Sequence, residues 1–174
     1  GKTLIEWQIE ALAANGIRDI SVVTGFHTEK VEALLASIDS VHAETIFNPF
    51  FQVADNLGSC WMAKAKMDGD FIILNGDTIV SPEIVRRLIA GARMPITVTV
   101  DVKPAYDEDD MKVTRVGDRL VAVGKRLSAR ESNAESIGML AFTGMGGALF
   151  REKIEAMLRT PEGVKRWYLR AIDE

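Results

Sequence analysis

Cysteine and histidine are scarce in this chain of 174 residues, which contains one cysteine, Cys60, and two histidines, His27 and His42. A single cysteine excludes an internal disulfide and a cysteine-rich zinc site. The two histidines do not have the spacing of paired metal ligands. Because so little cysteine is typical of proteins from reducing compartments, we expect a cytoplasmic protein.

Long apolar runs and an excess of positive charge are also missing. No apolar stretch approaches the roughly 20 residues of a membrane-spanning helix, and the chain does not open with a charged and then apolar signal segment. The net charge of −4 and the pI of about 5.3 argue against a general nucleic-acid surface, which needs clustered lysine and arginine. We therefore expect neither a membrane nor a nucleic acid as partner.

Hydrophobic residues make up 47% of the sequence, which is enough for one domain with a sizeable core. Helical and strand patterns alternate in the first half. The expected helices are residues 4–12, 28–37 and 57–67, and the expected strands are residues 20–23, 41–47 and 71–74. This alternation predicts an α/β fold with a doubly wound, mainly parallel (mixed) sheet.

The pattern changes after Pro95. Residues 96–102, 111–116 and 120–124 favour strands, and a turn at 116–119 joins the last two, which predicts a β-hairpin insertion. A further strand is expected at residues 137–142, followed by helix from about 147 to 171 with a break near Pro161.

The stretch "FIILNGDTIV" combines an apolar run with a bare carboxylate. Residues 71–74 read as a strand buried on both faces, and Asn75-Gly76 closes it, so Asp77 is expected at the carboxyl end of the strand. Ligands of open α/β sheets bind at that edge. From the pattern alone, Asp77 is either a metal ligand or a cap for the turn before Ser81.

Two further segments have both a binding and a structural interpretation. In "NLGSC", Gly58 would let the backbone approach a flat base while Asn56 and Ser59 offer hydrogen bonds; alternatively, Asn56 or Ser59 caps a helix. The run "YDEDD" from Tyr106 would hold an ammonium group, or is simply a solvated loop. Trp61 and Trp167 are aromatic walls or core residues.

Familiar catalytic loops are not found. The sequence has neither a GxSxG elbow nor a phosphate-binding Gly-Lys-Ser/Thr loop. The segment from Gly144 to Gly147 partly imitates a dinucleotide loop, but Leu149 occupies its third glycine position, so we interpret it as a plain turn.

Several of these segments together resemble the nucleotidyltransferase family, which joins an NTP to a phosphorylated sugar, alcohol or amine. The resemblance rests on "GKTLIEWQIEALAANGIRDISVVTGF", "DNLGSCWMA", "DFIILNGDTIV", "VGKRL" and "AESIGML", and it covers nearly the whole chain. The acidic "YDEDDMKV" with "ESIGML" is most similar to cytidylyltransferases of the phosphocholine or 2-aminoethylphosphonate type.

The resemblance implies a Rossmann-like nucleotidyltransferase fold and transfer of CMP from CTP to a small phosphorylated or phosphonate-bearing amine, with release of pyrophosphate. Attack by one anion on another requires a cation, so Mg²⁺ is the expected cofactor, with Asp77 as its ligand. Lys125 is the expected catalytic cation near the phosphates. The implied nucleotide-binding residues are Asn56, Leu57, Gly58, Ser59, Asn75 and Gly76. The implied acceptor-binding residues are Tyr106, Asp107, Asp109, Glu135 and Ser136.

The sequence departs from the family pattern at both ends. Neither the glycine-rich phosphate loop before Gly1 nor a strand with a second metal-binding aspartate after the "WY" segment is present, so residues 1–174 are expected to be a single nucleotidyltransferase domain that is incomplete at both ends. The alternatives are a sugar- or inositol-phosphate nucleotidyltransferase and a non-catalytic nucleotide-binding domain. The sequence does not predict the oligomeric state.

Overall fold

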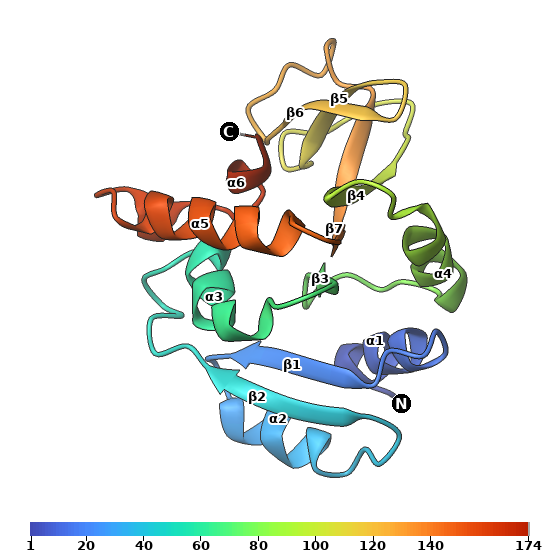
Figure 1. The fold of residues 1–174 in the computed structure, drawn as a ribbon, viewed down its shortest axis with the longest axis vertical. Helices are drawn as coiled ribbons and strands as arrows, with labels where there is room; N and C mark the ends of the chain where they lie inside the picture. Colours follow the sequence, from blue (N-terminus) through green and yellow to red (C-terminus); the bar gives the residue numbers. More distant parts are fainter. Residues whose placement is uncertain (174) are drawn as a thin grey trace.

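The computed structural model describes residues 1–173, in which helices and strands alternate along most of the chain (Figure 1). The α-helices are α1 (Leu4–Ala13), α2 (Thr28–Leu35), α3 (Asn56–Met62), α4 (Pro82–Gly91), α5 (Gly146–Leu158) and α6 (Arg170–Asp173). The strands are β1 (Asp19–Thr24), β2 (His42–Phe47), β3 (Phe71–Leu74), β4 (Ile96–Asp101), β5 (Lys112–Val116), β6 (Arg119–Val123) and β7 (Ala134–Phe142). Two 3₁₀ turns, η1 (Lys64–Lys66) and η2 (Gly163–Lys165), complete the fold.

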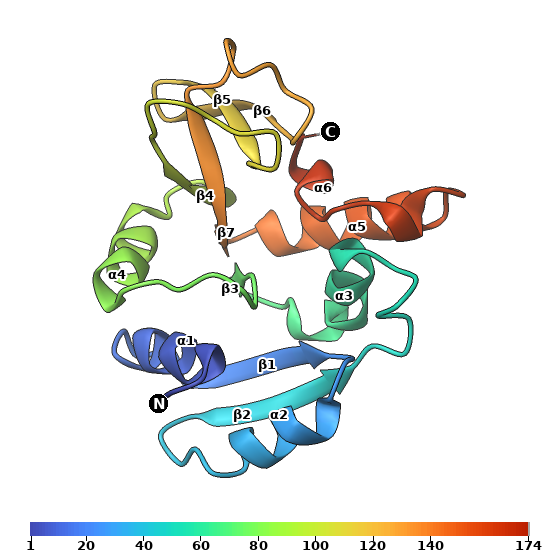
Figure 2. The same ribbon diagram turned by 180° about the vertical axis from the view of Figure 1, so that it is seen from behind.

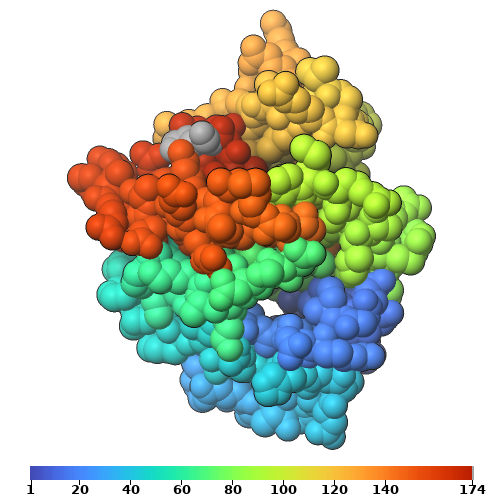
Figure 3. Space-filling model, viewed as in Figure 1, coloured from blue at the N-terminus to red at the C-terminus, as the bar shows by residue number. Residues whose placement is uncertain are grey.

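Two sheets organise these elements. Strands β1 and β2 form a parallel pair, joined by the crossover helix α2 that a parallel connection requires. The second sheet has the order β3-β7-β5-β6, with β4 also paired to β7. No strand pairing joins the two sheets within residues 1–173. In the space-filling view an opening lies between α1 and α3, close to this junction (Figure 3).

The mixed α/β fold predicted from the sequence is confirmed, including the β5–β6 hairpin. Parallel pairing is confined to β1 and β2 among the described strands, because β7 runs antiparallel to β3, β4 and β5. Strand β7 follows a hairpin and a loop rather than a helical crossover, so it returns against its neighbours. The second sheet is therefore antiparallel in all its described pairings.

Local capping signals account for the starts of α1 and α4. Thr3 and Glu6 form a reciprocal capping box at α1, and the Ser81 hydroxyl accepts a hydrogen bond from the Ile84 N–H at α4. The predicted helix at 57–67 is shorter, since α3 ends at Met62 and η1 follows. The predicted helix at 147–171 is divided into α5, η2 and α6, with the break at the expected Pro161 region.

Strand β7 is buried on both faces and lies between two layers of helices (Figures 1 and 2). Leu140 and Phe142 belong to a core cluster with residues of α3 and α5, whereas Met139 and Ala141 belong to a cluster with residues of α1 and α4. Alternate side chains of a strand point to opposite faces, so one strand serves both clusters. None of the helices in the described residues is long and apolar enough to cross a membrane.

Candidate active site

A pocket of about 450 Å³ lies at the carboxyl end of β3. Six parts of the chain line it: the start of α3, the turn after β3, the segment before β5, the segment after β6, the first half of β7, and the segment before α6. The lining residues are Asn56, Asn75, Asp77, Thr78, Asp109, Asp110, Met111, Lys125, Glu135, Ser136, Ile137, Gly138, Trp167 and Leu169.

Many residues predicted from the sequence meet in this pocket although they are far apart in the chain. Both predicted catalytic residues, Asp77 and Lys125, line it. The predicted nucleotide-binding residues Asn56 and Asn75 and the predicted acceptor-binding residues Asp109, Glu135 and Ser136 also line it.

Four predicted nucleotide-binding residues do not line the pocket. Leu57 is fully buried in the hydrophobic core, so its side chain serves packing. Gly58 and Ser59 lie within α3, where the Ser59 hydroxyl accepts a hydrogen bond from Asn48. Gly76 is exposed in the turn beside Asp77. The alternative helix-cap role of Asn56 or Ser59 is wrong. Asp55 is the N-cap residue of α3, and no side chain forms a capping hydrogen bond there.

Two predicted acceptor-binding residues also lie outside the lining. The Tyr106 hydroxyl accepts a hydrogen bond from the backbone N–H of Lys103 (3.3 Å), and the backbone N–H of Asp107 donates to the Asp110 carboxylate (2.7 Å). Both residues support the loop that carries Asp109 and Asp110. The aromatic ring in the lining is that of Trp167.

The turn that carries Asp77 is fixed by groups from two other elements. The buried Gln8 of α1 donates from Nε2 to the carbonyls of Asn75 and Thr78, each at 2.8 Å. From β7, the carbonyl of Gly138 accepts the Asn75 N–H at 2.8 Å, and that of Ile137 accepts the Thr78 hydroxyl at 2.9 Å. The exposed Asp77 carboxylate therefore projects from a well-held backbone.

Tyr168 connects the segment before α6 to the two asparagines. Its hydroxyl donates to Asn75 Oδ1 at 3.0 Å, and its backbone N–H donates to Asn56 Oδ1 at 2.9 Å. Burial raises the pKa of the Tyr168 phenol, so it remains a protonated donor. These bonds orient both amide side chains at the pocket wall.

Lys125 lies between an aromatic ring and a carboxylate. Its Nζ is 4.6 Å from the ring centroid of Trp167 and 3.6 Å from Asp109 Oδ1. Trp167 is 37% exposed, so of the two interpretations of this residue the structure supports a pocket wall. A cation over an indole ring is stabilised by the quadrupole of the ring.

The pocket is strongly acidic. Among the described residues that line it, four are acidic (Asp77, Asp109, Asp110 and Glu135) and one, Lys125, is basic. Lys103 Nζ pairs with both Asp110 (2.8 Å) and Glu135 (2.9 Å). Lys103, followed by the Asp107 N–H, lowers the pKa of Asp110 to about 2, whereas desolvation raises the pKa of Glu135. One ammonium compensates two carboxylates there, so the pocket favours a cationic ligand.

The residues present suit a magnesium ion that is shared with a phosphorylated ligand. No cluster of three or more His, Cys, Asp or Glu that could hold a metal occurs in residues 1–173. Mg²⁺ commonly takes only one or two protein carboxylates, with phosphate oxygens and waters completing the octahedron. The Asp77 carboxylate fits that ligand set.

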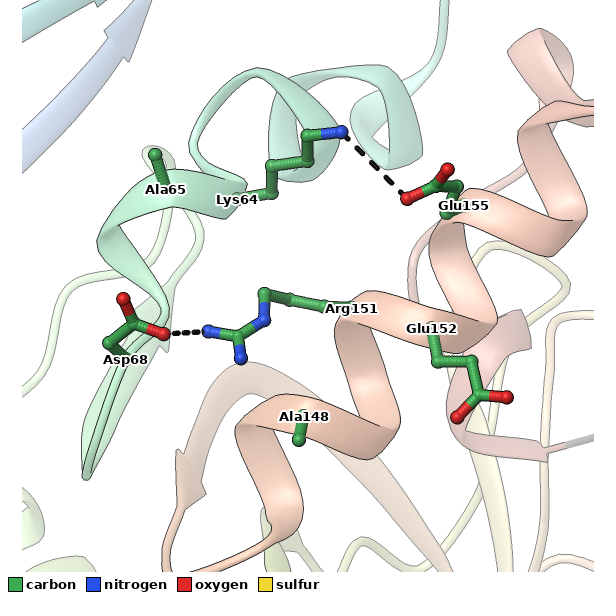
Figure 4. A pocket seen from close by; sticks show the side chains of 7 residues that line it. All are labelled: Lys64, Ala65, Asp68, Ala148, Arg151, Glu152 and Glu155. Atoms are coloured by element: carbon green, nitrogen blue, oxygen red, sulfur yellow. Dashed lines mark hydrogen bonds and ion pairs between the residues drawn. The ribbon is translucent and has the colours of Figure 1, made fainter.

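A second pocket, of about 430 Å³, lies between η1 and α5 (Figure 4). Two ion pairs lie in its lining, Lys64 with Glu155 at 3.8 Å and Arg151 with Asp68. None of the residues predicted from motifs lies there. The pocket at the end of β3 is therefore the candidate active site.

Sequence reasoning missed several residues that build this site. Gln8, Lys103 and Lys112 contact site backbone or side chains. Gln8 lies in α1, Lys112 begins β5, and Lys103 lies in the segment after β4. Tyr168 occurs in the "WY" segment, in which the sequence indicates a wall only for the tryptophan. No local sequence signal separates these residues from surface residues.

Comparisons with known proteins support the resemblance found in the sequence. No family model matches the chain. A curated relative is the CTP:phosphoglutamine cytidylyltransferase of Campylobacter jejuni subsp. jejuni, 26% identical over 162 residues, covering 82% of this chain and 61% of the relative. The chain thus spans about three fifths of the length of that relative.

Solved structures share the fold. The inositol-1-phosphate CTP transferase from T. maritima has a TM-score of 0.70 at 19% identity and covers 84% of this chain and 60% of its own. The CTP:phosphocholine cytidylyltransferase (LicC) from Streptococcus pneumoniae has a TM-score of 0.72 at 17% identity and covers 99% and 71%. An apo UDP-glucose pyrophosphorylase has a TM-score of 0.77 at 11% identity and covers 98% and 74%.

Proposed function

We propose that this chain, which resembles the nucleotidyltransferases in sequence and shares their fold, is the core of a Mg²⁺-dependent cytidylyltransferase. It would transfer CMP from CTP to a small phosphorylated or phosphonate-bearing acceptor that carries an ammonium group. The observation that carries this proposal is the single pocket that brings Asp77, Lys125 and the acidic residues together. The relatives whose names include CTP support the choice of nucleotide.

The reaction is a displacement at the α-phosphorus of CTP. An oxygen of the acceptor's phosphate or phosphonate forms the new P–O bond, the bond between the α- and β-phosphates breaks, and its electron pair leaves with pyrophosphate. Mg²⁺, when bound, neutralises the charge that two approaching anions share. The chain contributes Asp77 as the ligand for that ion, and Lys125 as a positive group for the phosphates.

Nucleotide recognition is assigned to one end of the pocket. Asn56 and Asn75 are fixed by Tyr168, so their amide groups are pre-oriented for hydrogen bonds to a base or ribose. Gly76 leaves the turn beside Asp77 open to a phosphate. Gly58 and Ser59 would contribute only if the start of α3 meets the base directly.

Acceptor recognition is assigned to the acidic end. Asp109, Asp110 and Glu135 would stabilise an ammonium group by charge, and the Trp167 ring offers a face for the same cation. Ser136, which is almost fully buried, lines the pocket beside Glu135 and is assigned to the polar part of the acceptor. Tyr106 and Asp107 would act through the loop that they brace.

The test is a panel of nucleotides and acceptors assayed by pyrophosphate release from the intact protein with Mg²⁺. We expect CTP to outcompete ATP, GTP and UTP, and phosphocholine or 2-aminoethylphosphonate to outcompete inositol 1-phosphate and glucose 1-phosphate. Preference for a polyol phosphate would replace the amine acceptor by the sugar or inositol alternative. Binding of CTP without any turnover would support the non-catalytic binding domain.

A further inference from the structure

Lys112, the first residue of β5, is a buried lysine outside the lining of the pocket. It is 4% exposed, and all three of its acceptors are backbone carbonyls: those of Glu108 (3.2 Å), Asp110 (3.4 Å) and Lys125 (2.8 Å). A lysine ammonium has three N–H donors, so this set matches its full capacity.

The three carbonyls belong to the two chain segments that meet across the acceptor side of the pocket. Glu108 and Asp110 flank Asp109 in the acidic loop, whereas Lys125 follows the end of β6. On the pocket side the same two segments are joined by the Asp109–Lys125 ion pair, at 3.6 Å. Lys112 ties their backbones together from the buried side.

Stability alone does not account for a lysine at this place. Removing an ammonium from water is costly, and within residues 1–173 no carboxylate forms an ion pair with Lys112 to compensate it. An apolar side chain of similar length would avoid that cost, but it would leave the loop and the end of β6 without a common hydrogen-bond donor.

We propose that Lys112 is a positioning residue that fixes the acidic loop relative to Lys125, and thereby sets the distance between the carboxylates that hold the acceptor and the cation that faces the phosphates. The proposal rests on the acceptor assignment made under the proposed function. Its structural part, the linkage of residues 107–111 to residues 124–127, is independent of that assignment.

The test compares Lys112→Met with a matched variant of the same strand, Thr114→Val. Thr114 also donates from its side chain to a backbone carbonyl, that of Glu131 at 3.0 Å, but this bond lies away from the pocket. Losing hydrogen bonds from a charged donor is expected to raise the acceptor KM about tenfold in Lys112→Met. The CTP KM should stay within about twofold, and Thr114→Val should leave both constants unchanged.

Hydrogen exchange supplies a second readout that needs no activity. In Lys112→Met the amides of residues 107–111 and 124–127 should exchange faster than in the wild type, while those of α1, α4 and α5 do not change. Lys112→Arg, which keeps the charge and the donors, covers the case in which the methionine variant does not fold, and it should show smaller changes in the same two segments.

Equal increases of both KM values, or the same local exchange in Thr114→Val, would overturn the positioning role. If the wild-type protein transfers CMP to none of the acceptors, the proposed function fails, but the exchange pattern still decides whether Lys112 links the two segments.

Discussion

Asp77 is exposed, whereas the backbone that carries it is held from both ends of its turn. Gln8 binds the carbonyls on either side of it, and the Thr78 hydroxyl binds the carbonyl of Ile137. The hydrogen bonds that hold the turn do not involve the Asp77 carboxylate, but they fix its position. This separation makes the residue suitable for mutation.

Asp77→Asn is expected to lower kcat by a factor on the order of 10²–10⁴, because the amide is a poor ligand for Mg²⁺ while the site is otherwise intact. The free energy of unfolding should change by less than about 0.5 kcal/mol. Steady-state kinetics at increasing Mg²⁺ concentration and denaturant unfolding measure the two effects.

Asp118→Asn, an exposed aspartate in the β5–β6 turn, is the matched control and should leave both quantities unchanged. Turnover of Asp77→Asn within about threefold of the wild type would contradict the metal-ligand role.

Asp110 makes the stability of the acidic loop pH-dependent. Lys103 and the Asp107 N–H lower its pKa from 3.8 to about 2 in the folded protein. A lowered folded-state pKa means that the ionised form stabilises the fold above the unfolded value of 3.8, and that this contribution is lost as the pH falls towards 2. Asp110→Asn should therefore be less stable than the wild type near neutral pH, with a difference that narrows between about pH 4 and pH 2.

Urea denaturation of the two proteins over this range measures the difference. Glu135→Gln is an informative comparison, because desolvation shifts the pKa of Glu135 upward and its contribution has the opposite sign. A difference in stability between Asp110→Asn and the wild type that is independent of pH would contradict the lowered pKa of Asp110.

At the scale of elements, the pairing of β7 with β4 is irregular where β7 passes the site. Val98 and Val100 of β4 pair with Leu140 and Ser136, so extra residues of β7 are accommodated between these pairs. Gly138 lies in that irregularity with φ of +76°, and a Cβ there would lie 2.4 Å from Asn75 Nδ2. The irregularity brings the β7 backbone close to the turn that carries Asp77.

Gly138→Ala should destabilise the protein by about 2–5 kcal/mol, the sum of left-handed backbone strain and overpacking against Asn75. Gly117→Ala provides the comparison, because Gly117 also has positive φ (+59°) but nothing lies within 4 Å of its Cβ position. Its cost should be about 1 kcal/mol, from strain alone. If thermal or urea unfolding shows the same loss of free energy of unfolding in both variants, the Cβ at position 138 does not clash with Asn75.

Over the whole molecule, a row of aromatic rings joins the site to the core. Ring centroids are 4.6 Å apart for Phe71 and Phe142, 4.8 Å for Phe142 and Phe150, and 6.4 Å for Phe150 and Tyr168. The row connects β3, β7, α5 and the segment before α6. Because the Tyr168 hydroxyl also donates to Asn75, the row of rings runs from α5 to a residue of the pocket lining.

Phe150→Ala should cost about 3–5 kcal/mol, since the ring is 1% exposed and its removal leaves a cavity. Phe26→Ala removes a ring that is 74% exposed and should cost less than about 0.5 kcal/mol. Calorimetric or denaturant unfolding of both variants tests this contrast. If Phe150→Ala lowers the free energy of unfolding only slightly, α5 packs independently of β7.

Much of this organisation is predictable from local sequence. The apolar run at 71–74 and the turn at 116–119 each produce the element expected of them. The direction of β7 is not predictable in this way, because hydrophobic pattern identifies a strand but does not state which neighbours it joins. The parallel sheet expected for the whole first half is consequently limited to β1 and β2.

The sequence by itself determined where the candidate residues lie relative to local elements: Asp77 after a buried strand, Lys125 after another, and the acidic run at 107–110 in a loop. Only the tertiary structure decided which of them share a pocket: it placed Trp167 in the lining, Tyr106 outside the lining and Leu57 in the core. It alone also revealed Gln8 and Lys112, whose side chains bind carbonyls distant in sequence. The physical reason is that residue type and spacing fix local conformation, whereas burial and hydrogen-bond partners arise from contacts between segments far apart in the chain.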